Sequence, residues 1–254
     1  RCSSHCISVG ERVAYHGASA EEVRARLDLP RVEIRRTVSS TLDVAHELAA
    51  DGAPAGTLVV ADEQTAGRGR SARHWCSEPG AGIWLTLVER PTDRSALDVL
   101  SIRVGLRAAR VLDRHAPERV SLKWPNDLLV GGGKVGGILV ETRWRDARID
   151  WVALGVGINL RVPTGVSGAA ALMAGTSPID VLAELVPALR GAASARGVLA
   201  DGELEEYERR DSIRGRMVRE PAQGMASGLD RSGALIVRQA GRDVLCRSGS
   251  VVLA

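Results

Sequence analysis

Only two of the 34 basic residues of this chain are lysines, Lys123 and Lys134, and they lie within twelve residues of each other. An ammonium group is a compact point charge on a flexible stem, whereas a guanidinium group is a wide planar fork. A lysine retained in an arginine-rich chain therefore indicates a position where arginine does not substitute. Lys123 opens the segment 123–127, KWPND, in which Pro125 ends a predicted strand. We interpret Lys123 as a cation that projects into a cleft towards a carboxylate or an α-phosphate, although neighbouring Lys and Asp residues more often form a surface pair.

The segment 64–70, QTAGRGR, is a second candidate for binding chemistry, and Arg73 and Trp75 follow it. Its alternating glycines let the backbone approach a ligand closely, while backbone N–H groups and guanidinium groups face an anion. The segment therefore predicts an anion-binding loop. A solvent-exposed basic turn, or one that binds RNA, is the alternative that this motif alone leaves open.

Two glycine-rich segments invite comparison with nucleotide-binding loops, and neither matches. In 131–137 the phosphate-binding loop would need glycine at position 128, where the chain has Leu128. In 155–159 the dinucleotide fingerprint is broken by Leu160. Asn159 is one of only two asparagines, and it ends an apolar run. We interpret it as an amide that could meet a purine edge.

The composition excludes several classes of protein. The chain has 254 residues, 44% of them hydrophobic and 26% charged, and a net charge of +3, which is weak support for polyanion binding. No apolar run approaches the ~18 residues of a membrane span, and the N-terminus lacks the order of a secretory signal. Cys2, His5 and Cys6 lie close together, but no second ligand pair follows at zinc-site spacing. Free thiols in a reducing, cytoplasmic compartment are therefore expected.

The elements that must position these residues follow from periodicity and turn residues. Helices are expected at 20–27, from Thr41 to Gly52, and at 97–115, 178–196 and 203–210. Strands are expected at 32–36, 57–61, 82–89, 120–124, 128–130, 135–141 and 151–160. After Ser212, short alternating runs between turns predict a small β-barrel. We therefore expect a short N-terminal arm at 1–30, a catalytic domain at 31–211 and a C-terminal barrel at 212–254.

Taken together, in this order and spacing, the segments resemble the biotin protein ligase family. The resemblance runs from about Val32 to the C-terminus, and it is almost letter for letter at 64–70 and 123–127. It implies an α+β fold with a central mixed β-sheet flanked by helices, of the class II synthetase-like kind, and an SH3-like barrel at the C-terminus. By this resemblance the chain adenylates biotin with ATP and transfers biotin from biotinyl-5′-AMP to a lysine of a biotinoyl domain.

The resemblance also implies roles for individual residues. Catalytic roles fall to Lys123, Arg68 and Arg70. Biotin contacts fall to Ser40, Thr41, Gln64, Gly67, Arg68, Lys123, Gly136, Gly137 and Ile138. Nucleotide contacts fall to Arg70, Arg73, Trp75, Asn126 and Asn159. ATP and biotin are then substrates, Mg²⁺ accompanies ATP, and no protein metal site is expected because no carboxylate cluster identifies one.

The sequence departs from the family at a few places. Leu42 stands where asparagine usually follows Ser-Thr, so a polar role there is lost or moved, and Ala72 replaces a frequent glycine. The segment before Val32 is too short for a winged helix-turn-helix, so we expect the monofunctional type without an N-terminal DNA-binding domain. No DNA or membrane partner is expected, and the protein would be a monomer or homodimer. The alternatives are a lipoate or octanoate ligase of the same architecture and a biotin-responsive repressor.

Overall fold

The structure is a computed structural model that describes residues 14–254. The candidate zinc ligands Cys2, His5 and Cys6 lie outside this range, and so does most of the expected N-terminal arm. Within the described range, no helix has both the length and the apolar character needed to cross a membrane.

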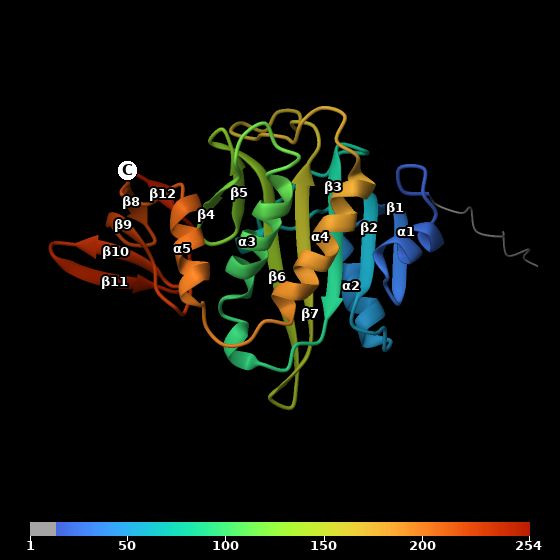
Figure 1. The fold of residues 1–254 in the computed structure, drawn as a ribbon, viewed down its shortest axis with the longest axis horizontal. Coiled ribbons are helices and arrows are strands. Elements are labelled where there is room, and N and C mark those ends of the chain that lie inside the picture. The colour runs from blue at the N-terminus through green and yellow to red at the C-terminus, as the bar shows by residue number, and fades with distance from the viewer. Residues whose placement is uncertain (1–13) are drawn as a thin grey trace, which may run out of the picture.

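A seven-stranded mixed sheet forms the centre of the molecule (Figure 1). Its strands are β1 (Arg31–Val38), β2 (Thr57–Gln64), β3 (Gly82–Glu89), β4 (Ser121–Lys123), β5 (Asp127–Val130), β6 (Gly133–Arg145) and β7 (Arg148–Asn159). They lie in the order β1-β2-β3-β7-β6-β5-β4. Only β1 and β2 pair in parallel, and the other neighbours are antiparallel. The expected α+β fold with a mixed sheet flanked by helices is thereby confirmed.

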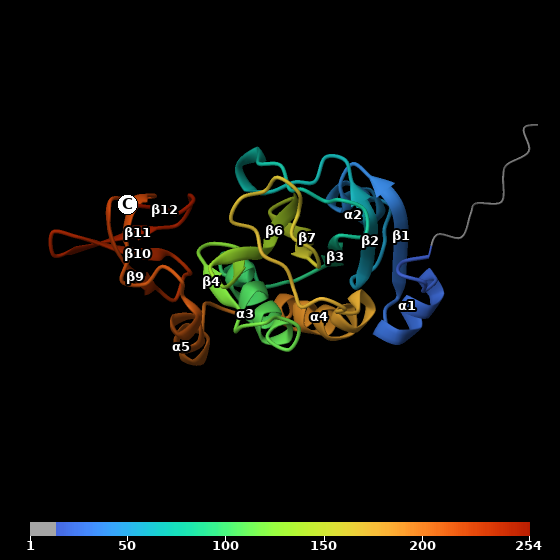
Figure 2. The ribbon, with the colours of Figure 1, turned by 90° about the horizontal axis from the view of Figure 1, so that it is seen from above.

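Helices cover both faces of this sheet. They are α1 (Ala20–Leu27), α2 (Thr41–Ala50), α3 (Leu100–Leu112), α4 (Pro178–Ala193) and α5 (Asp201–Arg210). Seen from above, α2 lies on one face and α3 and α4 lie on the other (Figure 2). The alternation along β2 explains both layers, because Leu58 and Val60 join the main core whereas Val59 packs with Ala45 of α2.

The start of α2 is fixed by local chemistry. The Ser40 side chain accepts a hydrogen bond from the Leu42 N–H at 3.3 Å and so caps the helix. The helix ends at Ala50, next to the predicted stop at Gly52. Helix α3 is shorter than the expected 97–115, since residues 97–99 form a turn after a 3₁₀ helix (Arg94–Ala96) and α3 ends at Leu112. Its N-terminal boundary therefore moves to Leu100 while its inward face stays as predicted.

The C-terminal region forms a second, smaller sheet. Its strands are β8 (Met217–Glu220), β9 (Gly224–Leu229), β10 (Leu235–Gln239), β11 (Arg242–Cys246) and β12 (Val252–Leu253). All neighbours are antiparallel, in the order β11-β10-β9-β8-β12. Because β11 and β12 are the two edges and do not pair with each other, this part of the described chain is an open sheet and no closed barrel. The sequence gives no sign of β12, whose two residues are too few for a periodic pattern.

The two sheets are joined through β4 and α5. The Ser212 N–H and hydroxyl both donate to the Leu122 carbonyl oxygen, at 2.9 and 3.0 Å. The Trp124 indole N–H donates to the Gly233 carbonyl oxygen at 3.0 Å. Val218 and Leu235 of the small sheet belong to the same core cluster as the central sheet. The division at Asp211 into two domains therefore stays a prediction, since both parts share one core.

Candidate active site

Two adjoining cavities lie beside the loop that connects β2 and β3. The inner cavity, of about 140 Å³, lies between the start of α2, this loop, β6 and β7. The outer cavity, of about 570 Å³, lies between the loop, β4, the 163–169 segment and the C-terminal sheet. The side chains that line both cavities are His74, Trp75, Asp127 and Lys134.

Most of the residues expected in the site do meet at these cavities. The inner cavity is lined by Ser40, Thr41, Gln64, Arg68, Arg70, Arg73, Trp75, Asn126, Gly137 and Ile138. The outer cavity is lined by Trp75, Lys123 and Asn159. Gly67 and Gly136 line neither cavity. Both positions instead require glycine because the backbone passes too close for a side chain. A Cβ atom at Gly67 would lie 2.5 Å from the Trp75 carbonyl oxygen, and one at Gly136 would lie 2.9 Å from the Gly157 carbonyl oxygen.

One end of the inner cavity is polar and held by hydrogen bonds. The Gln64 side-chain oxygen accepts from the Thr41 N–H at 2.9 Å and from the Thr41 hydroxyl at 3.2 Å. Its amide nitrogen donates to the Ser77 hydroxyl at 2.8 Å, and the Thr86 hydroxyl donates to Thr41 at 2.9 Å. The Gln64 amide is therefore fixed in orientation, with one N–H left to meet a ligand.

The Trp75 ring packs over Gly137 of β6 and Gly157 of β7, which lie opposite each other in the two strands. A Cβ atom at Gly157 would lie 2.6 Å from the Trp75 indole nitrogen, and one at Gly137 would lie 3.1 Å from its ring. The indole N–H is buried and has no hydrogen-bond partner among residues 14–254. The two glycines thus make room for the ring that lines both cavities.

Lys134 lies at the junction of the two cavities. Its Nζ is 2.5 Å from the Asp127 Oδ1 and 5.2 Å from the centre of the Trp75 ring. The ion pair and the ring hold the ammonium group in place. The expectations above left Lys134 and Asp127 out of the site, although the rarity of lysine in this chain was a usable signal.

Lys123 is the last residue of β4 and lies at the outer cavity. It pairs with Asp127 across the β4–β5 hairpin and lines only the outer cavity. A ligand group in the inner cavity therefore meets Lys134 before Lys123. The role of Lys123, including its assignment to the biotin carboxylate, stays a prediction.

Two arginines of the loop face the C-terminal sheet. Arg70 donates to the Gly249 carbonyl oxygen at 3.3 Å, and Arg73 donates to the Ser250 hydroxyl. Burial lowers the pKa of Arg70 from its ordinary value, and the nearby charge of Arg73 lowers it further. Desolvation and like charge both disfavour this cation, so an anion between the two would be bound favourably.

The two asparagines hold backbone groups of β6. Asn126 Nδ2 donates to the Ile138 carbonyl oxygen at 2.7 Å. Asn159 Nδ2 donates to the carbonyl oxygens of Lys134 and Ala170, at 3.2 and 3.0 Å. The Asn159 Oδ1 is buried and accepts no hydrogen bond from the described part of the chain. Its donor is thus already used inside the protein, and only its acceptor is free for a ligand such as the amino group of a purine.

The lining offers little to a metal ion. Asp127 is the only carboxylate among the residues that line the two cavities, and Lys134 already pairs with it. Within residues 14–254, no cluster of three or more His, Cys, Asp or Glu side chains is placed to hold a metal. A preformed protein site for Mg²⁺ therefore does not fit these residues.

Comparison with known proteins agrees with this arrangement. The biotin/lipoate A/B protein ligase family matches residues 34–159. This range includes β6 and β7, the two strands that lie beside the inner cavity. A biotin–[acetyl-CoA-carboxylase] ligase of Paracoccus denitrificans is 35% identical over 223 residues, covering 77% of this chain and 90% of that protein. The chain belongs to the biotin/lipoate A/B protein ligase family. Within this family the chain is similar to the biotin protein ligases, as the resemblance in the sequence predicted.

Other members of the family extend this result. A bifunctional ligase/repressor of Bacillus spizizenii is 44% identical over 124 residues, which are 48% of this chain and 38% of that protein. The match thus spans well under half the length of that relative. A biotin protein ligase from Aquifex aeolicus, solved in complex with biotin and ATP, is similar in structure with a TM-score of 0.73. It covers 89% of this chain and 99% of its own at 24% identity, which supports the shared fold.

Proposed function

We propose that this protein is an ATP-dependent biotin–protein ligase that forms biotinyl-5′-AMP and passes biotin to a lysine of a biotinoyl domain. The observation that carries the proposal is the meeting of two cavities at Lys134. The inner cavity has a polar end of fixed hydrogen-bonding groups, and the outer one is large enough for a nucleotide. A ligand carboxylate in one cavity and a phosphate in the other would meet beside one ammonium group.

Each group then has a defined task. The Thr41 and Gln64 side chains hold the ureido ring, and the Trp75 ring and Gly137 form the apolar wall. A carboxylate oxygen of biotin attacks the α-phosphorus of ATP, the bond to the β-phosphate oxygen breaks, and pyrophosphate leaves. In the second step a lysine amine attacks the carbonyl carbon of the mixed anhydride and AMP leaves. Asn159 Oδ1 accepts from the purine amino group.

The protein contributes mainly position and charge. One cation at ~4 Å, with an effective dielectric constant of ~20, is worth about 4 kcal/mol before desolvation. Lys134, Arg70 and Arg73 supply such charges near the reacting phosphate, and Lys123 supplies one at the outer cavity. Mg²⁺ enters as the counterion of the ATP phosphates, because the cavity lining holds no free carboxylate for it.

The polar end of the inner cavity favours biotin over lipoate. A dithiolane ring has no carbonyl oxygen like that of the ureido ring, so the remaining N–H of the Gln64 amide would stay unpaired, which costs about 1–3 kcal/mol. A thermal-shift comparison of the two acids should show stabilisation by biotin alone. Equal stabilisation by lipoate would favour the alternative ligase.

Mass spectrometry tests the reaction directly. A biotinoyl domain incubated with this protein, biotin and MgATP should gain the mass of one biotinyl group, and omission of ATP should abolish the gain. If a freshly prepared acceptor domain gained no mass with correctly folded protein, the proposal would be refuted.

The remaining expectations stay proposals. The acceptor is the biotinoyl domain of a biotin-dependent carboxylase in the cytoplasm, and the protein acts as a monomer or homodimer. The C-terminal sheet is a relative of the SH3-like barrel. DNA binding is not part of the proposed function, and a gel shift with promoter DNA at physiological salt tests that exclusion.

A further inference from the structure

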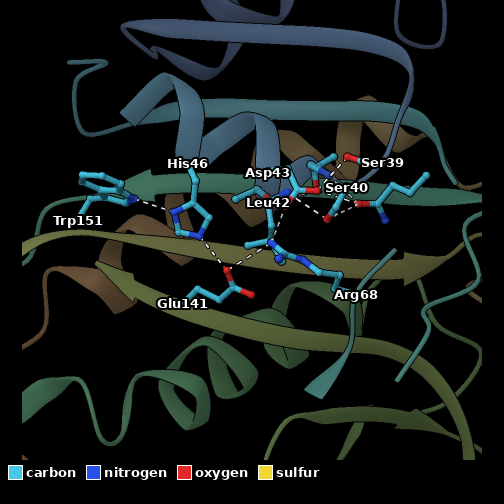
Figure 3. A network of polar contacts seen from close by, with 11 residues as sticks. Ser39, Ser40, Leu42, Asp43, His46, Arg68, Glu141 and Trp151 are labelled. Carbon is cyan, nitrogen blue, oxygen red and sulfur yellow. Dashed lines mark hydrogen bonds and ion pairs between the residues drawn. The ribbon is translucent and has the colours of Figure 1, made fainter. Parts of the chain in front are cut away.

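Arg68, which lines the inner cavity, lies between two carboxylates, those of Asp43 and Glu141 (Figure 3). Its Nη2 is 3.1 Å from the Asp43 Oδ1 on α2 and 3.3 Å from the Glu141 Oε2 on β6. The three side chains are about one-third exposed. One guanidinium group thus ties the basic loop to a helix and to a strand of the central sheet.

Both carboxylates are themselves held in place. His46 bonds to Glu141 through Nε2 at 2.8 Å, and the Trp151 indole N–H donates to the His46 Nδ1 at 2.9 Å. An indole nitrogen only donates, so Nδ1 must be the acceptor and Nε2 carries the hydrogen that it donates to Glu141. Asp43 accepts from the Ser39 hydroxyl at 2.9 Å through its other oxygen.

The local charges separate Arg68 from the other arginines of the loop. Two carboxylates face one guanidinium group, so the cluster has a net negative charge and offers little positive potential to a phosphate. Arg70 and Arg73 donate instead to neutral oxygens of Gly249 and Ser250, which leaves their charges uncompensated by these bonds. The loop therefore contains one arginine suited to anchoring and two suited to an anion.

We propose that Asp43 and Glu141, the latter oriented by His46 and Trp151, are positioning residues that hold the basic loop over the inner cavity through Arg68. Arg68 then acts as the anchor of the loop and not as a cation on the phosphate, contrary to the catalytic role implied by the sequence. The kinetic part of this inference rests on the proposed function, whereas the placement of the loop does not.

Hydrogen exchange tests the anchor without any ligand. Peptides covering 65–75 include the N–H groups of Gly69 and Trp75, which bond to carbonyl oxygens within the loop. Glu141→Gln should speed their exchange several-fold, and Asp43→Asn/Glu141→Gln should speed it more. Glu184→Gln is a matched control, because Glu184 also lies between an arginine and a histidine and is 33% exposed against 31% for Glu141. Exchange in Glu141→Gln equal to that in the control would overturn the proposal.

Trp151→Phe tests the indirect part of the arrangement. It keeps a six-membered aromatic ring and removes the fused five-membered ring with the N–H group that orients His46. Loop exchange should rise, though less than in Glu141→Gln, while a role of Trp151 in packing alone would leave the loop unchanged and contradict the inference. Asp43 is partly exposed in the first turn of α2, so Asp43→Asn can replace Glu141→Gln in this comparison should Glu141→Gln fold poorly.

A double-mutant cycle tests the role of Arg68 in the reaction. Arg68→Gln and Glu141→Gln should each raise the KM for biotin several-fold with a smaller effect on kcat, and the double variant should be no worse than Arg68→Gln. A fall in kcat specific to Arg68→Gln, or additive losses, would show direct contact with the substrate and overturn the anchor. Absence of any ligase activity would refute the proposed function while leaving the exchange result to decide the anchor.

Discussion

At the scale of single residues, the two lysines of the chain occupy different positions at the site. Lys134 lines both cavities and is held by Asp127, whereas Lys123 lines only the outer cavity. Under the proposed function, Lys134 would lie where the carboxylate and the α-phosphorus meet, and Lys123 beside the rest of the nucleotide. An arginine at position 134 would put a planar fork in a space shaped for a point charge.

Lys134→Arg should therefore reduce the rate of biotin-dependent pyrophosphate release at least tenfold, which corresponds to about 1.4 kcal/mol of transition-state stabilisation. Lys123→Arg should mainly raise the KM for ATP. Both rates come from one pyrophosphate assay, with melting temperatures measured to confirm folding. A larger loss of kcat in Lys123→Arg than in Lys134→Arg would return the central role to Lys123.

Asn159 has both a structural and a binding aspect. Its amide N–H groups join β6 to the segment at Ala170, while its buried oxygen has no protein partner. Asn159→Ala should lower the free energy of unfolding by about 1–3 kcal/mol, because two carbonyl oxygens lose their donor. It should also raise the KM for ATP more than that for biotin. An unchanged KM for ATP together with lower stability would leave Asn159 a purely structural role.

At the scale of elements, β6 and β7 contribute to the site through the side chains they lack. Gly137 and Gly157 lie opposite each other in the antiparallel register, and the Trp75 ring covers both. The strands therefore bring a wide aromatic surface close to their own backbone. Leu42 packs against Gly155, which is two residues from Gly157 in β7. It therefore fills space at a position where the family usually has a polar side chain.

Gly157→Ala should displace the Trp75 ring, since the added Cβ would lie 2.6 Å from its indole nitrogen. We expect biotin affinity to fall at least tenfold by isothermal titration, with a change in tryptophan fluorescence. Gly202→Ala in α5 is the control, because a Cβ there meets nothing within 4 Å. Normal biotin binding by Gly157→Ala would mean that Trp75 is not part of the wall of the inner cavity.

At the scale of the whole molecule, Asp211 lies where the central sheet meets the C-terminal sheet. It forms an isolated bridge with Leu122, and its neighbours Ser212 and Ile213 line the outer cavity. Burial raises the pKa of Asp211 to about 6, and the charge of Glu208 also raises it, against hydrogen bonds that lower it. One of its oxygens is buried without a partner. The junction is therefore less stable with this carboxylate ionised.

The pH dependence follows from the direction of this shift. The folded protein binds the proton more tightly than the unfolded chain, so the contribution of Asp211 to stability is greatest below ~4 and is lost as pH rises through about 6. Asp211→Asn should therefore gain about 3 kcal/mol in free energy of unfolding at pH 8 and almost nothing at pH 4. Urea unfolding at both pH values measures this. A gain that does not depend on pH would contradict the raised pKa.

The sequence by itself determined the family, the mixed sheet with its helices, and most of the residues around the inner cavity. It could do so because helix caps, strand alternation and closely spaced motifs are local, and Ser40, Gln64 and Gly137 belong to such patterns. The open edge of the C-terminal sheet was not predictable, because pairing between β11 and β12 is a property of distant strands. The same holds for the place of Lys134 and for the contacts of Arg68. A cation acquires its role from the carboxylates and rings that surround it, and here Asp43, Glu141 and Trp75 come from separate parts of the chain that only the tertiary structure brings together.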